Sequence, residues 1–191
     1  MAVTIAGAVR LDFDDYVLYT ETHPDDSFEL IDGVIYRLAP EGDPHFLTRS
    51  AIQLHLSQVL DLARFAPYTE GSFPAPGWAD GPRPDNFVSR RPLLVDGQIT
   101  ARPGSSDIAL VIEVSSTSRP KDQKRAELYG RLIIPEYWLV DLRTAKVVAY
   151  SRPADGTYKK SQTLLRGEML ESTAVDGLRV AVDFLLQLAT K

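Results

Sequence analysis

One apolar run, Ile-Ala-Leu-Val-Ile-Glu-Val at residues 108–114, restricts the folds open to this chain more than any other segment. An uninterrupted apolar run of this length is typical of a strand buried on both faces of a sheet. Glu113 lies inside it, and a carboxylate there is costly unless it is paired with a cation or bound to a metal. The run therefore predicts a central strand with an ion pair or a metal ion at Glu113.

The chain has 191 residues, 44% of them hydrophobic, which is enough to bury a core of its own. We therefore expect a single domain over residues 1–191. The absence of cysteine excludes disulfides, thiolate zinc sites and a cysteine nucleophile. Because no signal peptide or membrane-spanning run is visible, we expect a cytoplasmic protein without a membrane partner.

The net charge of −5 is unevenly distributed along the chain. Residues 1–82 carry four Lys or Arg against thirteen Asp or Glu, whereas residues 83–131 carry nine against six. A locally basic face on an acidic protein permits contact with nucleic acid without requiring it. The alternative is that the basic segment 119–131 is only a solvated helix face.

Hydrophobic periodicity and turn residues predict the secondary structure in outline. The expected helices are 11–21, 45–66, 119–132 and 183–189, and the expected strands are 27–32, 34–39, 68–73, 85–90, 107–115, 137–141, 146–151 and 158–165. The first two strands alternate around Gly33, the pattern of a hairpin with an Asp-Gly turn. This order of elements predicts an α/β fold, a mixed β-sheet flanked by helices.

Asp85 and Glu113 are the candidate metal ligands. Carboxylate oxygens suit Mg²⁺ or Mn²⁺, which bind few carboxylates and keep several waters. The two residues become neighbours only if the strands 85–90 and 107–115 pair side by side. The alternatives are that Asp85 only forms a turn after Pro84, and that Glu113 is only the partner of an arginine.

The chain carries six landmarks in a fixed order: Phe28–Gly33, Pro44-His45, Pro84-Asp85, Asp107–Ser115, Asp122–Tyr129 and Pro135–Asp141. In this order they resemble the PD-(D/E)xK nuclease superfamily, specifically its Uma-type bacterial family of restriction-endonuclease-like proteins. The resemblance covers residues 12–185 approximately. It implies a restriction-endonuclease-like fold with an αβββαβ core, and a Mg²⁺-dependent endonuclease that hydrolyses phosphodiester bonds, with DNA as the expected partner.

The resemblance also implies roles for individual residues. Asp85, Glu113 and the backbone carbonyl of Val114 would hold the metal, Mg²⁺ or Mn²⁺, and a lysine would orient the attacking water. The usual superfamily lysine lies two residues after the glutamate, and Ser115 stands there instead. The Uma-type pattern carries a basic residue on the next helix, one turn before a tyrosine.

With Tyr129 as that tyrosine, the register selects Arg125; Lys124 is its neighbour, and Lys121 lies a turn earlier. Lysine adjusts its pKa and orients water, whereas arginine stays charged and is better suited to clamp a phosphate. The chemistry therefore favours Lys124, with a solvated basic helix face as its alternative.

Two further residues are auxiliary candidates. Glu29, in the first hairpin strand, lies either near the metal or in solvent beside Asp32. His45, at the start of the long helix, contacts either a phosphate or metal-bound water, or only caps the helix.

Two other functions remain open from the sequence. One is a catalytically degraded nucleic-acid-binding or assembly module on the same fold. The other is a metal-dependent hydrolase of small phosphate esters, which requires a closed pocket. Finally, the apolar C-terminal segment Phe184–Ala189 and the strand-rich region 145–165 predict a homodimer. The alternative is that this segment only caps its own sheet.

Overall fold

The computed structural model describes residues 10–75, 77, 79–116 and 119–189, with the side chains of 119–123 outside that description. Its elements are α1 (Phe13–Thr22), β1 (Phe28–Ile31), β2 (Val34–Arg37), α2 (Asp43–Val59), β3 (Ala66–Thr69), β4 (Asn86–Ser89), β5 (Leu94–Val95), β6 (Gln98–Ile99), a 3₁₀ turn (Ser105–Asp107), β7 (Ile108–Ser115), α3 (Arg119–Arg131), β8 (Glu136–Asp141), β9 (Lys146–Ala154), β10 (Thr157–Leu164), β11 (Met169–Glu171), β12 (Arg179–Ala181) and α4 (Val182–Leu185).

A six-stranded sheet in the order β10-β9-β8-β7-β4-β3 forms the centre of the fold. β7 and β8 are parallel and are joined through α3, and the other neighbours in the sheet are antiparallel. The segment α2-β3-β4-β7-α3-β8 is therefore an αβββαβ unit. The predicted α/β class, with a mixed sheet flanked by helices, is confirmed.

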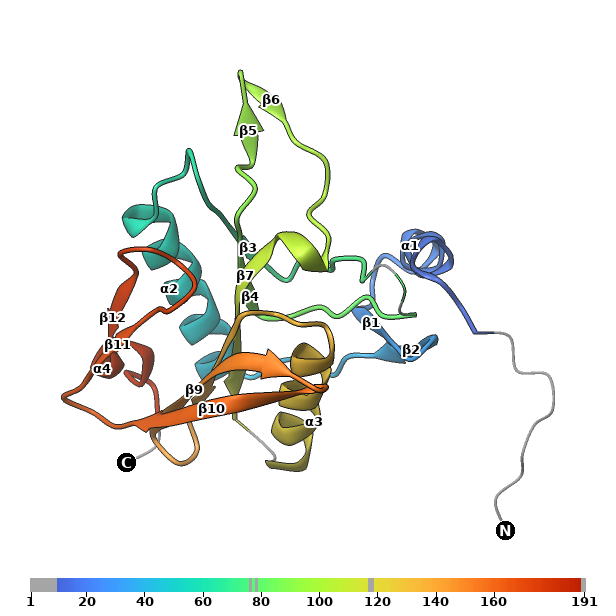
Figure 1. Cartoon of the computed structure of the whole chain (residues 1–191). Helices are drawn as coiled ribbons and strands as arrows, with labels where there is room; N and C mark the ends of the chain where they lie inside the picture. Colours follow the sequence, from blue (N-terminus) through green and yellow to red (C-terminus); the bar gives the residue numbers. More distant parts are fainter. Residues whose placement is uncertain (1–9, 76, 78, 117–118, 190–191) are drawn as a thin grey trace, which may run out of the picture.

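Two hydrophobic cores lie on opposite faces of this sheet, one under α2 and one under α3 (Figure 1). Side chains alternate along β7, so that Leu110 and Ile112 pack on the α2 side and Val111 packs on the α3 side. Val88 and Phe87 of β4 divide between the two cores in the same way. The alternation places Glu113, two residues after Val111, on the face that α3 covers.

The predicted hairpin at Asp32-Gly33 is confirmed. Ile31 pairs with Val34, leaving a two-residue turn in which both φ angles are positive, 49° and 74°. Positive φ at both central positions is what a type I′ turn requires. The hairpin is held against α3 because the buried Asp80 carboxylate accepts hydrogen bonds from the Asp32 backbone N–H and from Arg131.

The expected helix 45–66 is too long at its C-terminal end. α2 ends at Val59, because Leu60 is extended and Asp61 begins a separate turn. The Asp61 side chain accepts from the Ala63 N–H, and its carbonyl accepts from Arg64 and Phe65. Local bonds of this kind compete with the helix. The chain then enters β3, which is shifted from the predicted strand 68–73.

The segment 92–100 forms a β5–β6 arm that projects away from the sheet (Figure 1), where the sequence predicts only a loop. The β11–β12 pair was also not predicted, because each of its strands has only three residues. Among the helices in the described ranges, none is long and apolar enough to cross a membrane.

The C-terminal segment does not provide the exposed apolar surface that the sequence analysis expected. Leu185, Leu186 and Ala189 are buried in the core on the α2 side, and Phe184 packs against that core. Most of this segment therefore caps its own sheet, the alternative that the sequence analysis left open, although Leu188 is 42% exposed. The homodimer itself stays a prediction.

Candidate functional site

Asp85 and Glu113 lie side by side where β4 begins and β7 approaches its end. Asn86 pairs with Ile112, which places Asp85 directly opposite Glu113. Opposite residues of an antiparallel pair share a face of the sheet. Both side chains line one hollow of about 220 Å³, and the Val114 N–H donates a 2.7 Å hydrogen bond to Asp85 Oδ2. The strands that carry the two carboxylates therefore pair side by side, as the sequence analysis required for Asp85 and Glu113 to be neighbours.

Glu113 is held by two side chains from α3. The Tyr129 hydroxyl donates a 2.5 Å hydrogen bond to Glu113 Oε1, and Arg125 Nε lies 3.6 Å from the same oxygen. Burial raises the pKa of Glu113 to about 8, against the opposing effect of the Arg125 charge, and the nearby Asp85 charge adds to the increase. Burial therefore makes the ionised form of this carboxyl costly, and the Arg125 charge offsets part of that cost.

Arg125 is buried between two carboxylates. Its Nη2 lies 2.5 Å from Glu29 Oε2, so Glu29 belongs to the site through Arg125. Burial works against the charged form, but Glu113 and Glu29 together raise the pKa of Arg125 further above its ordinary value. Its Nη1 atom is buried and has no hydrogen-bond partner among the described residues. A buried guanidinium with an unused donor is suited to bind one more anion.

Lys124 is not brought to these carboxylates. It is exposed and lines a second, larger hollow that Glu29 and Arg125 also line, and it does not line the hollow that contains Asp85 and Glu113. Successive helical residues point about 100° apart, and of these two neighbours only Arg125 also lines the hollow that contains Asp85 and Glu113. Arg125 and Tyr129, four residues apart, do share a face. This spacing was the signal for Arg125 in the sequence. The side chain of Lys121 lies outside the described residues.

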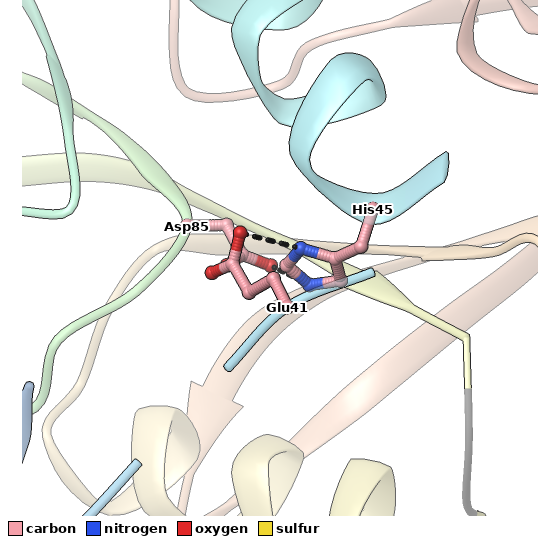
Figure 2. A group of neighbouring side chains, drawn as sticks. All are labelled: Glu41, His45 and Asp85. Carbon is pink, nitrogen blue, oxygen red and sulfur yellow. Dashed lines mark ion pairs between the residues drawn. The ribbon is translucent and has the colours of Figure 1, made fainter. Parts of the chain in front are cut away.

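His45, in the first turn of α2, lies between two carboxylates (Figure 2). Its Nε2 is 3.2 Å from Asp85 Oδ2, and its Nδ1 is 3.1 Å from Glu41 Oε2. Burial disfavours the imidazolium, but the hydrogen bond to Asp85 and the charges of Asp85 and Glu41 raise the pKa of His45 to about 9. The sequence analysis included His45 and missed Glu41, whose i,i+4 spacing to His45 was the available signal.

Three other charged residues surround the hollow and were also missed. Arg49 lies 3.3 Å from Glu41 and 2.6 Å from Glu70, and Arg83 lies 3.7 Å from Glu70. These residues come from α2 and from the loops that follow β3 and precede β4, so no single sequence motif contains them. Together these ion pairs hold the Glu41 and Glu70 side chains at the edge of the hollow.

The donor set fits a divalent cation. Asp85 and Glu113 offer carboxylate oxygens from one face of the sheet. The Val114 backbone N–H donates a hydrogen bond to the Asp85 carboxylate. Hard oxygen ligands of this kind are those that Mg²⁺ and Mn²⁺ take in proteins.

These titrating groups predict how stability depends on pH in the absence of metal. The pKa of His45 is about 9 in the folded protein against an ordinary value of 6.5. The folding stability that protonated His45 provides is therefore complete below pH 6.5 and is lost as pH rises through 9. The pKa of Glu113, raised from 4.5 to about 8, acts in the same direction, with a contribution that is lost as pH rises through 8.

We therefore expect the melting temperature in EDTA to fall between pH 6.5 and 9. His45 is partly exposed, so a contribution of roughly 1 kcal/mol is expected, or about 2–4 °C. The decline should be shallower in His45→Gln when both proteins are melted over the same pH series. A melting temperature that is flat or rises over this range would contradict the assignment.

The family Uma2, described as "Putative restriction endonuclease", matches residues 13–183 of the chain, which include the whole site. A solved structure described as a putative nuclease belonging to DUF820, from Anabaena variabilis ATCC 29413, is similar at a TM-score of 0.72 and 18% sequence identity. The match covers 94% of this chain and 99% of that chain. At this identity the likeness shows the fold. No curated protein matches the chain.

Proposed function

Because the chain belongs to the Uma2 family, whose description is "Putative restriction endonuclease", we propose that it is a divalent-metal-dependent endonuclease that hydrolyses phosphodiester bonds in DNA. Membership of the family supports a nuclease. The observation that carries the finer proposal is the placement of Asp85 and Glu113 on one face of neighbouring strands, with the buried Arg125 beside them.

Asp85, Glu113 and the backbone carbonyl of Val114 would hold the cation, Mg²⁺ or Mn²⁺. Such an ion, when bound, supplies positive charge to the scissile phosphate and lowers the pKa of a bound water. The Val114 N–H fixes the Asp85 carboxylate, and Tyr129 fixes that of Glu113, so both ligands are positioned before substrate arrives. Preorganised charges of this kind need little rearrangement during the reaction.

Arg125 is the residue of this chain that would bind the phosphate. Its Nε faces Glu113, its Nη2 faces Glu29, its Nη1 has no hydrogen-bond partner among the described residues, and the residue lines the hollow that a phosphate would enter. Arginine remains charged throughout, so it offsets negative charge on the phosphate without exchanging a proton. In this proposal Arg125 takes the place for which the sequence analysis favoured Lys124.

The second candidate function is a nucleic-acid-binding module without catalysis. The observation that favours it is the absence of a lysine amine beside Asp85 and Glu113 among the described side chains, where Arg125 lies instead. A binder of this kind would retain DNA in the presence of Mg²⁺ or Mn²⁺ and leave it uncut.

Removal of metal tests the proposed activity. We expect purified protein to nick or linearise supercoiled plasmid with Mg²⁺ or Mn²⁺, to lose this activity in EDTA, and to regain it when excess metal is restored. Gel electrophoresis over a time course measures the rate, and RNA and single-stranded DNA of the same length define the substrate. Cleavage that persists in EDTA would exclude the metal mechanism. Retention of DNA without cleavage under all metals would support the binding module.

A further inference from the structure

The β5–β6 arm exposes apolar side chains on a part of the chain that projects from the body. Leu94 and Ile99 lie directly opposite each other across its two strands, and they are 54% and 80% exposed. Opposite residues of an antiparallel pair share a face. Their neighbours Leu93 and Val95 are 45% and 50% exposed. We propose that the arm is an interface between two copies of this chain, which pack their Leu94–Ile99 faces together about a twofold axis.

The arm has a defined shape but little support. Asp96 and Gly97 form a two-residue turn in which both φ angles are positive, 51° and 76°, as a type I′ turn requires. The Thr100 N–H donates to the Leu93 carbonyl over 2.9 Å. A side chain added at Gly97 would meet nothing within 4 Å, so the tip stands in open space (Figure 1). An isolated two-stranded hairpin is only marginally stable in water, and burial of its apolar face stabilises it.

The charges of the arm complement those of a second arm. Three exposed arginines, Arg90, Arg91 and Arg102, lie where the arm joins the body, and the only charged residue between them is Asp96 at the tip. When two arms pack antiparallel about a twofold axis, the tip of each lies over the base of the other. Each Asp96 is then close to the arginines of the other copy. Opposite charges in contact of this kind fix the register of an interface.

The base of the arm has room to receive a tip. A hollow of about 420 Å³ lies there, and its lining includes Arg64, Arg90 and Pro92. The Arg91 side chain is 44% exposed, and its nearest printed acidic partner, Asp107, is 3.9 Å away. A twofold contact uses the same two surfaces on both copies, so tip and base are both satisfied and the assembly closes after two chains.

DNA is the competing occupant, and the charges at the tip disfavour it. Residues 94–99 include no Lys or Arg and one Asp. Segments that enter the grooves of DNA place cations close to its phosphates. The arm also leaves the sheet where β4 ends and β7 begins, whereas Asp85 and Glu113 lie towards the other ends of these strands. The arm therefore points away from the proposed catalytic hollow.

The mass in solution tests the interface. Light scattering on a size-exclusion column, in EDTA and without DNA, is measured from about 1 to 100 μM protein, the range in which weak and strong dimers separate. We expect wild-type protein to have twice the 21.2 kDa mass of one chain. Ile99→Lys places a charge on the packed face and should weaken the dimer about 30-fold or more, the scale for a central interface residue. Leu94→Lys is a second variant of the same face.

Leu54→Lys is the matched control. Leu54 is 61% exposed on α2, so this variant makes the same chemical change on an exposed leucine outside the arm. It should remain a dimer with the wild-type affinity. Thermal melts of all variants in the same buffer show whether each one is folded.

A charge exchange tests whether the partner is a second copy. Asp96→Arg alone brings like charges together at each tip and should weaken the dimer about 10-fold. Addition of Arg91→Asp in the same chain restores opposite charges at both ends of the twofold contact, so it should recover most of the lost affinity. A partner other than this chain would not produce that recovery.

Wild-type protein with the mass of one chain at every concentration would overturn the interface, as would a dimer that Ile99→Lys and Leu94→Lys leave intact. A dimer that only Leu54→Lys separates would place the contact on α2 and also overturn it. A single chain whose DNA retention falls in Ile99→Lys would assign the arm to DNA instead. Because neither metal nor DNA is present in the mass measurement, its result is independent of whether the protein cleaves DNA.

Discussion

Replacement of Asp85 by asparagine is expected to slow DNA cleavage about 1,000-fold, which corresponds to about 4 kcal/mol of transition-state stabilisation. Asparagine keeps the size of the side chain and still offers an oxygen to the Val114 N–H, which now donates to Asp85 over 2.7 Å. It removes the negative charge that a metal requires at this position. The loss should therefore appear in the cleavage rate and in metal affinity, with little change in folding.

The measurement is a single-turnover plasmid cleavage assay with Mg²⁺, together with a Mn²⁺ titration and a thermal melt. Asp176→Asn is the matched control, because Asp176 is an exposed aspartate that pairs with Arg64. It makes the same chemical change outside the hollow and should cleave at the wild-type rate. Equal rates for Asp85→Asn and wild type would show that cleavage does not depend on this carboxylate, and the proposed metal site would then fail.

The second large effect is expected at Arg125. Arg125→Ala leaves Glu29 and Glu113 buried without their cation, and breaking a buried pair in this way costs about 3–5 kcal/mol. Loss of a charge aimed at the phosphate should also slow cleavage by about 100-fold or more in protein that remains folded. Arg125→Lys keeps the charge, so we expect it to restore much of the stability and of the rate.

Lys124→Ala is the comparison that decides between the two neighbours. Lys124 is exposed and does not line the hollow that contains Asp85 and Glu113, so its loss should leave the rate within about twofold of wild type, as for an ordinary surface substitution. Urea denaturation measures stability, and the plasmid assay measures cleavage at a temperature where every variant is folded. Loss of cleavage in Lys124→Ala, with Arg125→Ala active, would restore Lys124, which the sequence analysis favoured on chemical grounds.

The fold could be predicted in outline because its signals are local. The run 108–114 defines β7, and the Asp32-Gly33 turn defines the first hairpin. Both depend on residues that are close in sequence. The end of α2 could not be predicted in this way, because periodicity continues past Val59 and the competing bonds of Asp61 appear only in the folded chain.

The site was predicted less completely than the fold. Asp85 and Glu113 followed from strand patterns, and the structure places them together. The choice between Lys124 and Arg125 as the cation beside these carboxylates depended on how α3 is rotated about its axis. A difference of one residue along a helix decides whether a side chain faces the sheet or solvent. Glu41 lies in a loop, and loop positions carry no periodicity that relates them to a distant carboxylate.

The parallel pairing of β7 with β8 also bears on how the protein is made. The site draws on residues from Glu29 to Arg125, and the strand that carries Glu113 pairs with β8 at Glu136–Asp141. During synthesis the N-terminal part leaves the ribosome first, and parallel pairing waits for both the crossover helix and the second strand. β7 therefore gains its parallel neighbour only after β8 has emerged, so the sheet around Glu113 is completed after every residue of the proposed site has been synthesised.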